Sequence, residues 1–116
     1  MKKYKFKDFY GESVVLIPII KTYQNNGRLA IDLMDEEGEF FTMITINLND
    51  SLSDSNNNLA FVDTNNCVWA EEFITSNKLG IRTKHKGYSG YCEYPEYLFD
   101  LTMLNREETI NEWMWS

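Results

Sequence analysis

The sequence predicts an α+β fold, in which an antiparallel sheet of about four to six strands carries one main helix and a short C-terminal helix. Three observations support this class. The first half of the 116-residue chain alternates apolar and polar residues, an Asn-Gly pair separates two alternating segments, and the apolar period becomes helical after residue 63. At 43% hydrophobic residues the composition suffices for one core, so we expect residues 1–116 to form a single domain.

The alternating segments predict strands joined as a meander. Pro18 falls inside the second segment and lacks an N–H, so it requires an edge strand or a bulge at that point. Asn26-Gly27 predicts a tight hairpin turn, and Asp35-Glu36-Glu37-Gly38 predicts a second, acidic turn. The predicted strands cover residues 5–9, 13–23, 28–34, 39–48, 59–62 and 97–101.

The second half of the chain predicts the main helix. Cys67, Ala70 and Ile74 recur at helical spacing, which indicates a helix over residues 66–77 that ends near Lys78 and Gly80. The polar segment 49–58 is expected to be a mobile loop. Residues 84–97, KHKGYSGYCEYPEY, are interpreted as the return loop after the helix, and residues 105–116 as a short amphipathic helix.

Charge and hydropathy exclude several classes of function. A net charge of −7 and a pI near 4.6 argue against direct binding to nucleic acid, and they favour a partner protein with a basic surface. The longest apolar run, residues 14–20, is far shorter than the roughly 20 residues of a membrane span. The basic N-terminus lacks the apolar stretch of a secretory signal. We therefore expect a cytoplasmic protein of a bacterial host cell, with no membrane partner.

Catalytic chemistry finds little support in the sequence. His85 is the only histidine, and it would have to activate Ser89 or Cys92, neither of which has the context of a known nucleophile. The adjacent pair Glu71-Glu72 would point apart on a helix. We expect no catalytic residues, no enzyme activity and no required cofactor.

Zinc is the one metal that the residue types suggest. Cys67, Cys92 and His85, with Asp63 near the helix start, could supply four ligands of the kinds that zinc prefers. The cysteines are 25 positions apart and neither belongs to a Cys-x-x-Cys pair. The alternative is two buried thiols and a solvated histidine, and the sequence leaves both interpretations open.

An acidic, aromatic surface is the predicted partner-binding site. Tyrosine-rich and glycine-rich segments provide large contact areas at low entropic cost, and carboxylates complement a basic partner. The candidate residues are Asp35, Glu36, Glu37 and Glu39 at the acidic turn, and Tyr88, Tyr91, Glu93 and Glu96, followed by Asp100, in the later segment.

Three segments resemble a family of small uncharacterised proteins that conjugative elements and prophages of Gram-positive bacteria carry. The segments are NNGRLAIDLMDEEGEFFTMITINL, FVDTNNCVWAEEFI and GYSGYCEYPEYLFDL, and the resemblance covers residues 25–101. Val68 departs from the family pattern, which often has proline after the residue that matches Cys67.

The genetic setting implied by this resemblance suggests counter-defence. Together with the acidic charge it leads to the hypothesis of an anti-CRISPR protein that binds and inhibits an RNA-guided type II CRISPR nuclease and blocks DNA loading. The alternative hypothesis is an accessory or maintenance protein of a mobile element that acts through protein–protein contacts without enzymatic activity.

Overall fold

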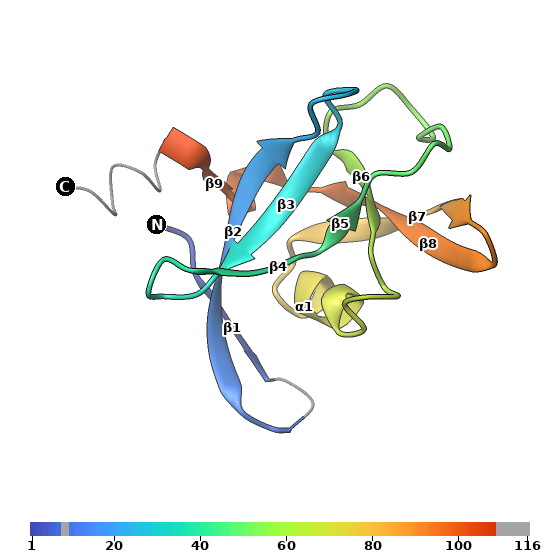
Figure 1. Ribbon diagram of the computed structural model, residues 1–116. Helices are drawn as coiled ribbons and strands as arrows, with labels where there is room; N and C mark the ends of the chain where they lie inside the picture. Colours follow the sequence, from blue (N-terminus) through green and yellow to red (C-terminus); the bar gives the residue numbers. More distant parts are fainter. Residues whose placement is uncertain (8–9, 109–116) are drawn as a thin grey trace.

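The computed structural model describes residues 1–7 and 10–108 and contains two β-sheets and one α-helix within them (Figure 1). The α+β class predicted from the sequence is confirmed, but the prediction of a single sheet is wrong. The elements in chain order are β1 (Tyr4–Lys7), β2 (Ser13–Thr22), β3 (Leu29–Met34), β4 (Phe40–Met43), β5 (Thr45–Ile46), β6 (Leu59–Val62), α1 (Ala70–Ser76), β7 (Gly80–Ser89), β8 (Cys92–Phe99), the 3-10 helix η1 (Leu101–Met103) and β9 (Asn105–Arg106).

The first sheet is the predicted meander with one strand added. Strands β1 to β4 are neighbours in sequence order and antiparallel, and β9 returns from the end of the described chain to pair with β2 in parallel. Of the C-terminal helix predicted over residues 105–116, residues 105 and 106 form β9 instead, whereas Glu107 and Glu108 have helical backbone. Residues 109–116 lie outside the described residues, so the rest of that prediction stays untested.

Pro18 occupies a local gap in the hydrogen-bonding ladder of β2. Strand β1 pairs with residues 13–16 of β2, and β9 pairs with residues 19 and 20, so neither reaches Pro18. The Pro18 carbonyl accepts a hydrogen bond of 2.9 Å from Asn105 Nδ2. Because the nitrogen and carbonyl of one residue face the same edge of a strand, the missing N–H costs no ladder bond here.

The second sheet arises because the predicted strand 39–48 divides at Ile44. The Ile44 N–H donates to the Ile31 carbonyl of β3 at 3.1 Å, whereas the Ile44 carbonyl accepts from the Asp63 N–H at 2.9 Å, just after β6. Strand β4 therefore belongs to the first sheet and β5 to the second, whose order is β5-β6-β8-β7. The Ile44 side chain is fully buried between them.

Residues 84–97, predicted as a return loop, form most of a β-hairpin. Ser89 pairs with Cys92 across the two-residue turn Gly90-Tyr91, and Gly90 has a φ of +60°, which this kind of turn requires at its first position. Gly87 lies where a Cβ atom would come within 2.6 Å of a Leu48 methyl and 2.8 Å of the Phe61 ring. These glycines build a turn and a close packing contact within a hairpin, so their presence does not indicate a loop.

The helix is shorter than predicted, and its two ends are set by specific hydrogen bonds. Before it, Asp63 Oδ1 accepts from the Asn66 N–H at 3.2 Å and closes a turn, and residues 66–69, which were predicted to be helical, precede the helix. After it, the Leu79 N–H donates to Ile74 and the Lys78 N–H to Thr75, at 2.9 and 3.2 Å, the pair of bonds of a Schellman motif.

One apolar core joins both sheets and the helix. The first sheet contributes residues such as Leu16 and Ile31, the second sheet Val62 and Tyr97, and the helix Phe73. A smaller cluster lies on the other face of the second sheet, where Leu48, Phe61 and Tyr94 are buried together.

Candidate functional site

The acidic turn between β3 and β4 is held in shape by the side chain of its first residue. Asp35 Oδ1 accepts from the N–H groups of Glu37 and Glu39, at 2.9 and 3.0 Å, and the Asp35 N–H donates to the Glu39 carbonyl at 2.9 Å. Gly38 supplies the positive φ of +85° that closes the turn. One carboxylate therefore organises the backbone, and the following acidic side chains extend from a defined loop.

This turn concentrates negative charge on the surface. Carboxylate oxygens of Asp35, Glu37 and Glu39 lie within 4.8 Å of one another, and both glutamates are exposed. Glu36 forms a 3.5 Å ion pair with Lys3. Like charges at this separation repel one another, so a cation brought to the turn gains energy from several carboxylates at once.

An apolar hollow borders the acidic turn. A groove of about 270 Å³ runs beside Asp35, Glu36 and Glu37, and its other walls are Val14, Val15 and Leu16 of β2 and Phe41 of β4. Phe41 is 46% exposed, so the groove combines an aromatic surface with a rim of carboxylates. The aliphatic stem of a lysine or arginine fits such a surface while its charged end meets the acids.

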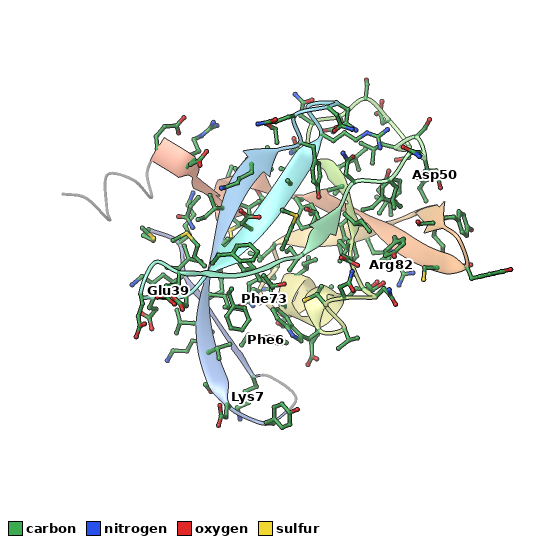
Figure 2. The ribbon with its side chains drawn as sticks, viewed as in Figure 1. Phe6, Lys7, Glu39, Asp50, Phe73 and Arg82 are labelled. Atoms are coloured by element: carbon green, nitrogen blue, oxygen red, sulfur yellow. The ribbon has the colours of Figure 1, made fainter. Side chains whose placement is uncertain are left out.

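The tyrosines of the second predicted group lie elsewhere on the molecule. Tyr88 and Tyr91 are exposed at the β7–β8 turn, and Glu93 pairs with Lys86 at 3.3 Å. Figure 1 shows this hairpin projecting from one side of the molecule, whereas Glu39 is labelled at the opposite side in Figure 2. The predicted residues therefore do not form one continuous acidic and aromatic face.

Glu96 does not belong to any surface, because it is completely buried. Its carboxylate accepts hydrogen bonds from the Ser53 N–H at 2.8 Å, the Ser53 hydroxyl at 2.5 Å and the Thr83 hydroxyl at 2.7 Å. Burial by itself would raise the pKa of Glu96, but these hydrogen bonds to the charged form outweigh it and the pKa is lowered. Glu96 was predicted to bind a partner, but its buried carboxylate instead holds Ser53 and Thr83 in place within the protein.

The same network fastens the polar loop 49–58 to the β7–β8 hairpin. The Ser51 carbonyl lies 2.7 Å from His85 Nε2, and Asp50 Oδ2 accepts from the Tyr88 N–H at 2.6 Å. Leu52 packs on the small apolar cluster beneath. Strand β7 bulges between Arg82 and Lys86, opposite Glu96, which brings Thr83 and His85 to this loop.

The structure does not bring the four predicted zinc ligands together. Cys67 is buried in the main core, where burial and the charge of Asp63 raise its pKa to about 11, which disfavours a thiolate ligand. Cys92 packs against the smaller cluster, and His85 contacts the Ser51 carbonyl. Among the described residues, three ligand atoms meet within 4.8 Å only at the acidic turn.

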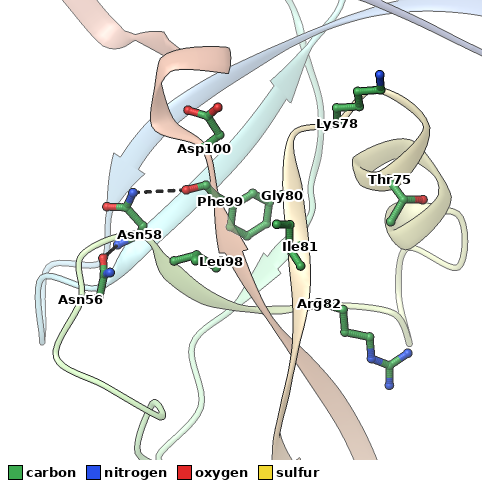
Figure 3. A pocket seen from close by; sticks show the side chains of 10 residues that line it. All are labelled: Asn56, Asn58, Thr75, Lys78, Gly80, Ile81, Arg82, Leu98, Phe99 and Asp100. Carbon is green, nitrogen blue, oxygen red and sulfur yellow. Dashed lines mark hydrogen bonds between the residues drawn. The ribbon is translucent and has the colours of Figure 1, made fainter.

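A second and wider groove, of about 690 Å³, was not predicted from the sequence. It crosses the end of the second sheet beside α1, as Figure 3 shows. We call it the Ile81–Leu98 groove, after the two exposed side chains that form its floor. Its lining residues are Asn56, Asn58, Thr75, Lys78, Gly80, Ile81, Arg82, Leu98, Phe99 and Asp100.

These features define a small α+β protein whose candidate sites are two grooves of different charge on its surface. The chain belongs to the family described as a domain of unknown function, DUF4313, whose model matches residues 19–114. No curated protein and no solved structure matches the chain. Within the described residues, none of the helical structure has the length and apolar character needed to cross a membrane.

Proposed function

We propose that this protein binds a basic, nucleic-acid-handling protein through its acidic turn, and that the partner is a type II CRISPR nuclease whose DNA loading it blocks. The observation that carries the proposal is the arrangement of Asp35, Glu37 and Glu39, whose carboxylates are grouped within 4.8 Å on a hydrogen-bonded turn. The resemblance to proteins of conjugative elements and prophages supports the choice of a defence nuclease.

The geometry of the turn suits an arginine or lysine of such a partner. A guanidinium group makes paired hydrogen bonds to carboxylates, and these are stronger than bonds between neutral groups. Val14, Val15 and Phe41 provide apolar contact for the stem of the same side chain. Because the turn is already formed in the free protein, little ordering is required when the partner binds.

Blocking DNA loading follows from the nature of the partner surface. RNA-guided nucleases hold the guide–target duplex in a positively charged channel. A folded protein with a net charge of −7 that places its acidic turn in such a channel competes with the phosphate backbone for the same cations. The proposed action therefore requires binding alone and no chemical step by this chain.

The test compares two variants of equal charge. Glu36→Gln/Glu37→Gln/Glu39→Gln removes charge at the turn but keeps Asp35, which organises the backbone. Glu12→Gln/Glu72→Gln/Glu93→Gln removes the same charge from exposed positions elsewhere. Binding to purified guide-loaded nucleases is measured by pull-down and by interferometry, and DNA loading by gel shift.

We expect the turn variant to lose about tenfold or more in affinity, and the control variant to stay within about twofold of the wild type. Inhibition of DNA loading should fall in parallel with affinity. If no type II nuclease binds the wild-type protein, or if both variants lose affinity equally, the proposal is wrong.

A further inference from the structure

The Ile81–Leu98 groove exposes two large aliphatic side chains next to each other. Ile81 of β7 and Leu98 of β8 are directly opposite in the sheet register, and their exposed fractions are 72% and 38%. Side chains opposite each other on one face of a sheet form a continuous apolar surface. The floor of the groove is therefore a preformed apolar contact site that water covers in the free protein.

The charges at the rim of this groove are arranged asymmetrically. Lys78 and Arg82 lie on the side of α1, whereas Asp100 lies on the opposite side, across the groove from Lys78, as Figure 3 shows. Arg82 is 3.3 Å from Glu71, so its charge is partly compensated. Within the described part of the chain no carboxylate lies at ion-pair distance from Lys78. An anion that enters from the α1 side meets the Lys78 ammonium group, which no carboxylate of the described residues neutralises.

Lys78 also has an unfavourable backbone conformation. Its φ is +58°, and it occupies the position after the helix where the Schellman motif normally has glycine. A side chain at positive φ crowds its own backbone, so lysine at this position makes the folded protein less stable than glycine would. The position that carries this strain is the one whose side chain stands at the rim of the groove (Figure 3).

We propose that the Ile81–Leu98 groove binds an acidic segment of a partner protein. An aliphatic or aromatic side chain of that segment covers Ile81 and Leu98, and a neighbouring carboxylate pairs with Lys78 beside Arg82. The groove is too open to enclose a small molecule, because most of the Ile81 side chain faces solvent, whereas an extended segment covers such a surface. Its chemistry is opposite to that of the acidic turn, so this is a separate site that does not depend on the proposed function.

Synthetic hexapeptides test the site directly. The probe is an acetylated and amidated Gly-Asp-Leu-Phe-Asp-Gly, and the controls are the same peptide with lysine in place of aspartate and with alanine in place of Leu-Phe. Amide chemical shifts of the ¹⁵N-labelled full chain are followed up to about 2 mM peptide, the range of a weak contact. We expect shifts at Gly80, Ile81, Arg82 and Leu98 with the acidic peptide and at none of them with either control.

Three lysine variants separate the side chain from the backbone strain. Lys78→Gly should raise Tm by about 2–6 °C and weaken peptide binding about threefold or more. Lys78→Ala keeps the strain, so it should weaken binding equally without raising Tm. Lys84→Ala removes the same charge from an exposed position on β7 outside the groove and should change neither quantity.

Four results would overturn the proposal. One is the absence of shifts at the groove with the acidic peptide, and another is an equal response to the lysine peptide. The third is unchanged peptide binding by Lys78→Gly with a raised Tm, which would show that the strain has no connection with binding. Concentration-dependent shifts at the groove without peptide would assign it to a second copy of this chain instead. The nuclease plays no part in these measurements, so their failure is distinct from failure of the proposed function.

Discussion

Replacing Glu96 by glutamine should lower the free energy of unfolding at pH 7 by about 1–2 kcal/mol. The amide keeps the shape of the carboxylate, and its oxygen can still accept from the Ser53 N–H. Its NH₂ group then faces the hydroxyls of Ser53 and Thr83, which rotate and accept instead. The lost free energy is therefore the extra strength that the negative charge gives to the three hydrogen bonds.

Alanine at the same position should cost about 3–4 kcal/mol, because it removes every acceptor and leaves a cavity. The Ser53 N–H then has no partner from β8, and we expect its amide hydrogen to exchange faster than in the wild type. Glu93→Gln provides the matched control, since Glu93 is an exposed acid on the same strand. It should change the unfolding free energy by less than about 0.5 kcal/mol.

The pH dependence gives the sharper test. The pKa of Glu96 is lower in the folded protein than its ordinary value of 4.5, so the ionised group stabilises the fold above pH 4.5. That contribution is lost as the pH falls through the lower, folded pKa. In urea titrations the wild type should therefore exceed Glu96→Gln in free energy of unfolding by less at pH 3 than at pH 7. A difference that stays constant over this range, or that is absent at pH 7, would refute the reasoning.

Two further predictions concern packing and thiol chemistry. Gly87→Ala should lower the free energy of unfolding by about 1–3 kcal/mol in urea titrations, because the new methyl group overlaps Leu48 and Phe61. Gly11→Ala isolates the backbone cost, because a Cβ atom at Gly11 meets no atom within 4 Å but the residue has a φ of +77°. This variant should lower the free energy of unfolding by only about 1 kcal/mol. With a thiol reagent at pH 8, the partly exposed Cys92 should react at least about tenfold faster than Cys67, whose pKa is about 11. Equal rates in the Cys67→Ser and Cys92→Ser variants would contradict this assignment.

Strands with a clear alternation of apolar and polar residues could be predicted from the sequence. The predictions for β2, β3 and β6 agree with the structure to within one residue at each end. The division at Ile44 could not be predicted, because a strand that is apolar on both faces looks the same whether it is central in one sheet or passes between two. Only the separate partners of its N–H and carbonyl reveal the change of sheet.

The hairpin β7–β8 was missed for a different reason. Glycine and proline usually interrupt strands, and here Gly87, Gly90 and Pro95 fall at a packing contact, a turn and the edge of a bulge. A period of two was nevertheless present in Cys92, Tyr94, Glu96 and Leu98, and it would have placed Glu96 beside a buried tyrosine. Its partner Ser53 is 43 positions away in the chain, and no local pattern indicates such a contact.

The candidate site was predicted in part. The acidic turn follows directly from its composition, and the structure adds the hydrogen bonds by which Asp35 shapes it. The Ile81–Leu98 groove depends on which segments meet at the end of the second sheet, and residues 56–58, 75–82 and 98–100 are distant in sequence. Their meeting is a property of the topology, which the sequence pattern did not resolve.

The backbone of Ile44 is hydrogen-bonded to both sheets, and this fixes the position of the two grooves relative to each other. The acidic turn belongs to the first sheet and the Ile81–Leu98 groove to the second, and both sheets share Ile44 and one core. A basic protein bound at one groove and an acidic segment bound at the other would therefore be held at a fixed separation. Such an arrangement raises the effective concentration of the second partner near the first without any direct contact between them.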